Sequence, residues 1–239
     1  MSDLIPCNLN SASDFITGEL ILVNKPVLWT SFDVVKKIRN LLKQKLQIKK
    51  LKVGHAGTLD PLATGLLVIC TGKYTRKINQ IQGQIKTYTG TFTLGATTAS
   101  YDLETEINNT FSTSHITKEL LTKTAENFIG EISQKPPVFS ALKKDGKRLY
   151  EYARAKKKID IKERKVFIHN FEIAKIELPI IHFKISCSKG TYIRSLANDF
   201  GLSLKSGAHL SKLCRTKIGD YNLKDAFSIT ELVEKINPS

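Results

Sequence analysis

Two side chains capable of ionic chemistry, His55 and Asp60, lie in a short segment of small residues, GHAGTLDPLATG (54–65). Glycine and alanine leave room for a backbone or a ligand to come close. Asp followed by Pro is also a frequent helix start, with Asp60 at the N-cap and Pro61 in the first helical position. The segment alone therefore leaves two roles open for Asp60, a helix cap or a reacting carboxylate, although a cap does not require small neighbours.

The elements that must position this segment mix strands and helices without a regular β-α-β rhythm, which favours an α+β fold. In KTYTGTFTLG (86–95), Tyr88, Phe92 and Leu94 alternate with threonines, as in a strand. Further strands are expected at 18–26, at 65–72, on both sides of Pro179 within 163–187, and at 207–221. Helices are expected after a cap at Ser31, over the apolar stripe from 116 to 129, after the turn at 189, and near the C-terminal end. No repeat or linker interrupts the chain, so residues 1–239 are expected to form a single domain.

The net charge of +15 and the pI near 9.6 point to a polyanionic partner, above all nucleic acid. Lysines are concentrated in 41–52, directly ahead of the small-residue segment, and in 143–165, where Tyr150 and Tyr152 stand between basic residues. Ammonium and guanidinium groups bind phosphates and aromatic rings stack on bases, so both stretches fit an RNA-contacting surface. The alternative is a charged helix face in solvent.

Several classes of protein are not supported by the sequence. The histidines and cysteines lack the spacing of a metal site, and GLLVICTGKYT fails as a P-loop because Leu67 and Tyr74 occupy the positions of its Gly and Ser/Thr. No GxGxxG is present, so we expect neither a metal nor a cofactor. Without a secretory signal or an apolar run of roughly 20 residues, a cytoplasmic location with no membrane partner is expected. The scattered cysteines, Cys7, Cys70, Cys187 and Cys214, are then expected to be reduced core residues.

Four ordered blocks resemble the TruB-type tRNA pseudouridine synthases. KVGHAGTLDPLATGLLVICTGKYTRK (52–77) is similar to the family's signature, and KTYTGTFTLG (86–95) to its Lys-x-Tyr strand. PPVFSALKKDGKRLYEYAR (136–154) and CSKGTYIRSLANDFG with GAHLSKLCR (187–215) resemble the two later blocks. The similarity spans roughly residues 18 to 221, nearly the whole chain. It implies the pseudouridine synthase fold, an α+β domain with a central mixed, largely antiparallel sheet flanked by helices and loops, and an RNA cleft across the sheet.

The resemblance also assigns roles to individual residues. Asp60 corresponds to the catalytic aspartate, Tyr88 to the tyrosine stacked on the target uracil, and Arg194 to the arginine paired with the aspartate. The residues that correspond to those lining the RNA or the flipped nucleotide are His55, Tyr192 and Leu213, and Lys189 and Arg215 are expected phosphate contacts. For Tyr88, Tyr192 and Leu213 the alternative is core packing, and for Lys189 and Arg215 it is a surface role.

The implied reaction converts uridine-55 in the T loop of tRNA to pseudouridine, after the base has been flipped into a pocket. A carboxylate can serve as a nucleophile on the sugar carbon C1′ or as a base at C2′, and the sequence does not choose between these routes. A non-catalytic RNA-binding protein of the same fold is the rival hypothesis.

The chain departs from the family in two places. Few residues follow Tyr221, so no C-terminal PUA domain is expected, and Ala99 stands where the family usually has Asp. Grip on the T arm of tRNA would then come from the catalytic domain, with 136–154 as an RNA-gripping insertion. The protein is expected to act as a monomer.

Overall fold

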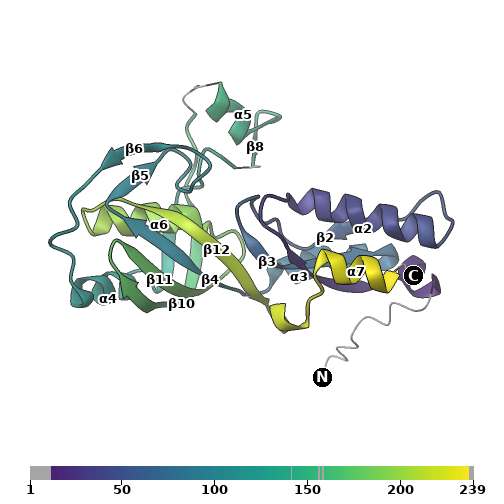
Figure 1. The fold of residues 1–239 in the computed structure, drawn as a ribbon. Coiled ribbons are helices and arrows are strands. Elements are labelled where there is room, and N and C mark those ends of the chain that lie inside the picture. Colours follow the sequence, from purple (N-terminus) through teal and green to yellow (C-terminus); the bar gives the residue numbers. More distant parts are fainter. Residues whose placement is uncertain (1–11, 141, 156, 158, 237–239) are drawn as a thin grey trace. The chain divides into compact units, whose positions relative to one another are not determined.

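The computed structural model describes residues 12–140, 142–155, 157 and 159–236 (Figure 1). The chain divides into two compact units, the first made of residues 1–87 and 214–239 and the second of residues 88–213. Two strands, β4 (Lys86–Leu94) and β12 (Ala208–Ile218), have residues in both units.

The first unit is built around β3 (Thr64–Thr71), which pairs antiparallel with β1 (Leu20–Lys25) and β2 (Val53–His55) and parallel with the end of β12. Alternate residues of β3 enter two cores, Leu67 and Ile69 on one side and Leu66, Val68 and Cys70 on the other. A strand buried on both faces is continuously apolar, which explains the sequence GLLVICT. The other elements of this unit are α1 (Ala12–Thr17), α2 (Ser31–Lys45), the short 3-10 helix η1 (Gly72–Lys77), α3 (Ile78–Gly83), β13 (Tyr221–Asn222), η2 (Leu223–Asp225) and α7 (Ile229–Ile236).

Helices α2 and α7 contribute to the core on one side of this sheet and α3 to the core on the other. The N-cap of helix α2 lies one residue earlier than expected. It is Thr30, not Ser31, and Thr30 forms a capping box with Asp33. The Ser31 hydroxyl is thereby available to bond the backbone of Leu59.

The second unit contains the strand order β12-β4-β11-β10-β7. The long hairpin of β10 (Arg164–Glu177) and β11 (Ile180–Cys187) brackets Pro179, as expected, and β7 (Gly130–Gln134) pairs antiparallel with β10. A cluster of phenylalanines fills the core, with the ring centroid of Phe92 4.3 Å from that of Phe183 and 6.0 Å from that of Phe200. The remaining elements are β5 (Ala96–Thr98), β6 (Ile107–Thr110), α4 (Lys118–Glu126), β8 (Lys143–Lys144), β9 (Lys147–Arg148), α5 (Leu149–Arg154) and α6 (Ile193–Ser203).

The α+β prediction is confirmed, since both units combine strands with helices (Figure 1). One detail is wrong: the apolar stripe from 116 to 129 is helical only over α4, and Ile129 is 46% exposed because the chain turns at Gly130 to enter β7. Cys70 and Cys187 are buried free thiols and Cys214 is half-buried, whereas Cys7 lies outside the described residues. Over the described ranges, every helix is too short or too polar to cross a membrane.

Candidate active site

Asp60 lies in a turn, not at the start of a helix. The Ala63 amide donates to the Asp60 carbonyl at 3.1 Å, which closes a four-residue turn with Pro61 in its second position, and β3 begins at Thr64. Proline's fixed φ suits the second position of a turn as well as the first turn of a helix. The helix-cap interpretation of Asp60 is therefore wrong, and the half-buried carboxylate has no helix to cap.

The residues before Asp60 are held through their backbone by Arg215 and Ser31. Nη2 of Arg215 donates to the Gly57 carbonyl at 2.9 Å, Nη1 to the Thr58 carbonyl at 3.4 Å, and Nε to the carbonyl of Leu66 in β3 at 2.9 Å. The Ser31 hydroxyl accepts from the Leu59 amide at 2.8 Å and donates to its carbonyl at 3.1 Å. We call residues 57–61 the Asp60 loop.

Lys25 secures the other end of the Asp60 loop. Its Nζ donates to the carbonyls of Trp29 at 2.6 Å, Pro26 at 2.8 Å and Pro61 at 3.3 Å, and the side chain is fully buried. The Lys25 pKa is lowered from 10.5 to about 8, mainly by burial and also by the Arg215 guanidinium, while the Asp60 carboxylate opposes the shift. The interaction between Lys25 and Asp60 is thus attractive. Two buried cations, Lys25 of β1 and Arg215 of β12, bind the backbone of the Asp60 loop.

His55 ends β2, close to the Asp60 loop. Burial lowers the pKa of its imidazole, the Arg215 guanidinium lowers it further, and a hydrogen bond with the Gly57 backbone acts in the opposite direction. His55 is therefore neutral at pH 7 and suits contact with an uncharged part of a ligand better than contact with a phosphate.

Two of the small residues around Asp60 leave room for the protein's own backbone and side chains, which was one of the two expectations. A Cβ at Gly65, which has φ +102°, would lie 2.4 Å from the Arg215 carbonyl oxygen, and one at Gly54 would lie 2.8 Å from Ile78. Both glycines are thus required by neighbours within the protein, because β12 and α3 pack directly on the segment.

Two more of the expected site residues, Tyr192 and Arg194, lie at the N-terminal end of α6 in the second unit. The side chain of buried Gln134 accepts from the Tyr192 amide at 2.8 Å and donates to its carbonyl at 3.1 Å. Nη1 of Arg194 donates to the Phe139 carbonyl at 2.9 Å and to the Ser100 carbonyl at 3.3 Å. Nε of Arg194 lies 3.5 Å from Oδ2 of Asp102, and both side chains are buried. A buried ion pair thus fixes the guanidinium.

Tyr88 and Leu213 belong to neighbouring strands of the second unit, β4 and β12. Tyr88 is 8% exposed and Leu213 is half-buried. The strands run so close that a Cβ at Gly90 would lie 2.2 Å from the Lys212 carbonyl oxygen.

The two expected phosphate contacts differ in the structure. Lys189 is exposed in the turn before α6, so its ammonium is accessible to a ligand. Arg215 is 1% exposed and its donors are used by three carbonyls, so the expected phosphate contact of Arg215 does not fit the structure. Its surroundings make it a positioning residue for the Asp60 loop.

The described part of the expected insertion, 136–154, contains the short hairpin β8–β9 followed by α5. Lys144, Lys147 and Arg148 are exposed there, and Leu149 is buried. Within the described part of the chain, no group of three or more His, Cys, Asp or Glu residues is arranged to hold a metal ion.

Sequence reasoning missed two residues of these sites, Lys25 and Asp102. The tripeptide Asn-Lys-Pro, in which the lysine is the last residue of β1, was a weak signal for Lys25, since a lysine that ends a buried strand needs acceptors. Asp102 had no comparable signal, because its pairing with Arg194 joins positions 92 residues apart.

The model of the TruB family pseudouridylate synthase, N-terminal domain, matches residues 40–193 of this chain. A protein of Flavobacterium johnsoniae named tRNA pseudouridine synthase B is 59% identical over 224 residues, which cover 93% of this chain and 98% of that protein. The protein of the same name from Parabacteroides distasonis is 51% identical over 219 residues, covering 92% and 93%.

Solved structures agree on the fold. A chain in the crystal structure of a Cbf5-Nop10-Gar1 complex has a TM-score of 0.69 and 27% identity, with 94% of this chain and 56% of that chain covered. A chain in the structure of an H/ACA RNP bound to a substrate RNA containing 2′-deoxyuridine has a TM-score of 0.66 and 26% identity, covering 92% and 53%. This chain thus spans about half the length of those solved chains and nearly all of its curated relatives. The chain belongs to the TruB family of pseudouridylate synthases.

Proposed function

We propose that this protein is a tRNA pseudouridine synthase that isomerises uridine-55 in the T loop of tRNA. The observation that carries the proposal is the near full-length similarity to proteins named tRNA pseudouridine synthase B, at up to 59% identity. The Asp60 loop supports it, since an acid on a turn fastened by Arg215, Ser31 and Lys25 is held rigidly enough to react.

We assign Asp60 as the catalytic aspartate. The reaction breaks the bond from C1′ to N1, turns the uracil, joins C5 to C1′ and finally removes the proton from C5. The Asp60 carboxylate would attack C1′ as a nucleophile or take a proton from C2′ to give a glycal, and both routes stay open. Tyr88 would stack on the free uracil and help to remove the C5 proton.

The roles of the other site residues stay predictions from the resemblance. His55, Tyr192 and Leu213 would line the flipped nucleotide, and Lys189 would contact a phosphate. The pairing of Arg194 with Asp60 likewise stays a prediction from the resemblance. We propose that the two units act as one catalytic domain, as a monomer in the cytoplasm that needs no cofactor, and that residues 136–154 grip the T arm.

The test is to incubate the protein with unmodified tRNA transcript and to map pseudouridine by position. We expect modification at uridine-55, and its complete loss in Asp60→Asn while tRNA affinity changes less than about threefold, since the amide keeps the size of the acid and only the reaction needs the charge. Asp225→Asn is the matched control, because Asp225 is an exposed acid of the same unit.

Two outcomes would contradict the proposal. Substantial turnover by Asp60→Asn would remove Asp60 from the chemistry. Tight tRNA binding by the unaltered protein without any pseudouridine would favour the rival, an RNA-binding protein that keeps the fold and not the reaction.

A further inference from the structure

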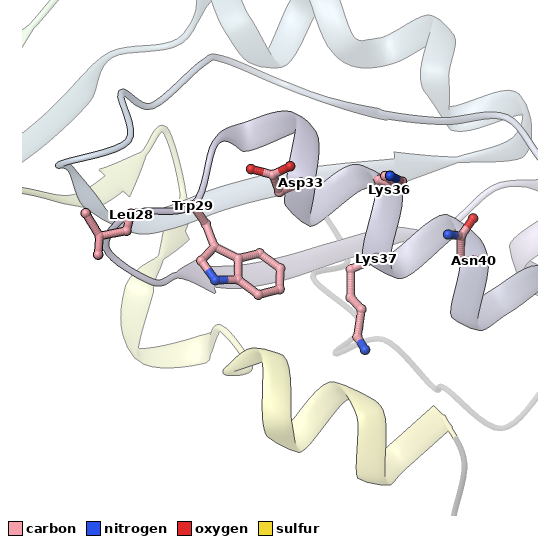
Figure 2. Close-up of a pocket in the computed structure, with 6 residues that line it drawn as sticks. All are labelled: Leu28, Trp29, Asp33, Lys36, Lys37 and Asn40. Carbon is pink, nitrogen blue, oxygen red and sulfur yellow. The ribbon is translucent and has the colours of Figure 1, made fainter.

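A pocket of about 420 Å³ opens at the N-terminal half of α2, and the proposed function leaves it without a role. Leu28 and Trp29 line it from the loop before the helix, and the side chains that line it from α2 are Asp33, Lys36, Lys37 and Asn40. Figure 2 shows the Trp29 indole and the Lys37 side chain on the same side of α2, with Leu28 beyond the indole. All six residues belong to the first unit.

The pocket combines apolar surface with cations. Leu28 is 74% exposed, while Trp29 is half-buried against the core. Exposed large apolar side chains that stand together commonly mark a binding surface. Lys36 and Lys37 are exposed beside them. An aromatic face next to ammonium groups is the combination that binds an unpaired nucleotide, through its base and its phosphate.

Among the described residues that line the pocket, Asp33 is the only acid, and its carboxylate is already engaged. Oδ2 accepts from the Thr30 amide at 2.9 Å and from the Thr30 hydroxyl at 2.6 Å, and these bonds lower its pKa. The two lysines therefore outnumber the acid, and the charge of the lining favours an anion.

The loop that forms the pocket is bonded directly to the Asp60 loop. The Leu28 amide donates to the Pro61 carbonyl at 2.8 Å, with Leu28 at φ +68°, a conformation that non-glycine residues rarely adopt. Lys25 joins the carbonyls of Trp29 and Pro61 through one ammonium group. A ligand in this pocket thus sits on backbone that also carries the catalytic loop.

We propose that this pocket binds an unpaired nucleotide of the tRNA substrate, distinct from the uridine that is isomerised. The base packs against the Trp29 indole and Leu28, Lys36 and Lys37 contact its phosphates, and the Asn40 amide is placed to bond a ribose or base edge. The inference rests on the proposed function, because the ligand is a second part of the same substrate.

The experiment uses a property of the sequence: Trp29 is the single tryptophan of the chain. We expect its fluorescence to be quenched as unmodified tRNA is titrated, and its accessibility to acrylamide to fall, because a stacked base covers the ring. Heparin is the control polyanion and should leave the signal unchanged. No change with tRNA, or an equal change with heparin, would overturn the proposal.

Variants give the second readout. Lys36→Ala with Lys37→Ala should weaken tRNA binding about threefold to tenfold and reduce the slope of log affinity against log salt by about 1 to 2. Trp29→Leu should weaken it about tenfold, and Trp29→Phe, which keeps a ring, by less. Lys118→Ala with Lys123→Ala, which removes two exposed lysines from α4, is the matched control.

Failure of this inference and failure of the proposed function are distinguishable. Pseudouridine formed by the unaltered protein tests the function, whereas the affinities and the Trp29 signal test the pocket. Normal turnover together with unchanged tRNA binding in both sets of variants would contradict nucleotide binding in the pocket and leave the proposed function intact. Thermal unfolding of each variant shows whether it is folded, and the fluorescence titration needs no variant at all.

Discussion

At the scale of single residues, the main finding is that Asp60 owes its position to side chains remote in sequence that bind backbone carbonyls. Arg215 alone bonds the carbonyls of Gly57, Thr58 and Leu66. A guanidinium presents several donors in a planar fork, so one residue can fix two consecutive peptide groups and a neighbouring strand together. Lysine cannot reproduce this geometry with one ammonium group.

We therefore predict that Arg215→Lys lowers kcat for pseudouridine formation about tenfold to a hundredfold while the Kd for tRNA changes less than about threefold, because a displaced carboxylate reacts poorly with a substrate that still binds. Added methylguanidinium should restore part of the activity of Arg215→Ala. Single-turnover rates and binding titrations separate the two effects. Arg76→Lys, at an exposed position, is the control.

A loss of tRNA affinity in Arg215→Lys, with a shallower salt dependence and an unchanged kcat, would restore the earlier assignment of Arg215 as a phosphate contact. Absence of rescue by methylguanidinium, with intact folding, would count against positioning through the guanidinium.

The sequence predicted which residues belong to the candidate site but not which contacts hold them in place. Asp60 and His55 stand out because their neighbours are small, and α6 and its arginine follow from a turn-to-helix pattern. The burial of Arg215 and Lys25 was not predictable, since their acceptors are backbone atoms that carry no sequence signature. For Arg215 those atoms belong to residues about 150 positions earlier in the chain.

At the scale of elements, the strands were predicted more reliably than the turn that matters most. Alternation in β4 and the double-sided burial of β3 leave clear patterns. Asp-Pro is compatible with a helix start and with a turn, and only the strand that follows at Thr64 decides for the turn. The local sequence is thus compatible with both structures, and the pairing of β3 with its neighbouring strands selects the turn.

The basic stretch at 143–165 supports a prediction at this scale. Replacing Lys156, Lys157 and Lys158 with Ala should weaken tRNA binding and reduce the slope of log affinity against log salt by up to about 2 to 3, since each lost phosphate contact removes about 0.7 to 0.9. Lys156 and Lys158 lie outside the described residues. Binding titrations at several salt concentrations provide the measurement.

The matched control for the basic stretch replaces three exposed lysines elsewhere, Lys118, Lys123 and Lys224. Equal salt slopes in the two triple variants would argue that the basic stretch acts only through net charge and has no specific role in gripping RNA.

At the scale of the whole molecule, the buried Lys25 should change how the free energy of unfolding depends on pH. Its pKa is about 8 in the folded protein and 10.5 as the ordinary value. Between these pH values the unfolded chain binds a proton at Lys25 that the folded chain has released, so the contribution of Lys25 to the free energy of unfolding rises with pH. The slope is at most about 1.4 kcal/mol per pH unit, and the total is about 3 kcal/mol.

We predict that this rise is absent in Lys25→Met, measured by urea unfolding from pH 8 to pH 10.5. The variant also loses three hydrogen bonds and is less stable throughout, so the difference in slope is the relevant quantity. Lys235→Met, at an exposed position of α7, controls for the loss of a surface ammonium. Parallel pH curves for the unaltered protein and Lys25→Met would show that burial does not shift this amine.

The main-chain bonds of the Asp60 loop have a consequence for how this family can change over time. Thr58 is exposed and engages Arg215 only through its carbonyl, so its side chain is free to vary without moving the acid. The geometry of the loop depends instead on the side chains of Lys25, Ser31 and Arg215, which are far in sequence from the motif that contains Asp60. Substitutions at these distant sites should therefore show strong epistasis with Asp60, while drift within the motif's exposed positions leaves activity intact.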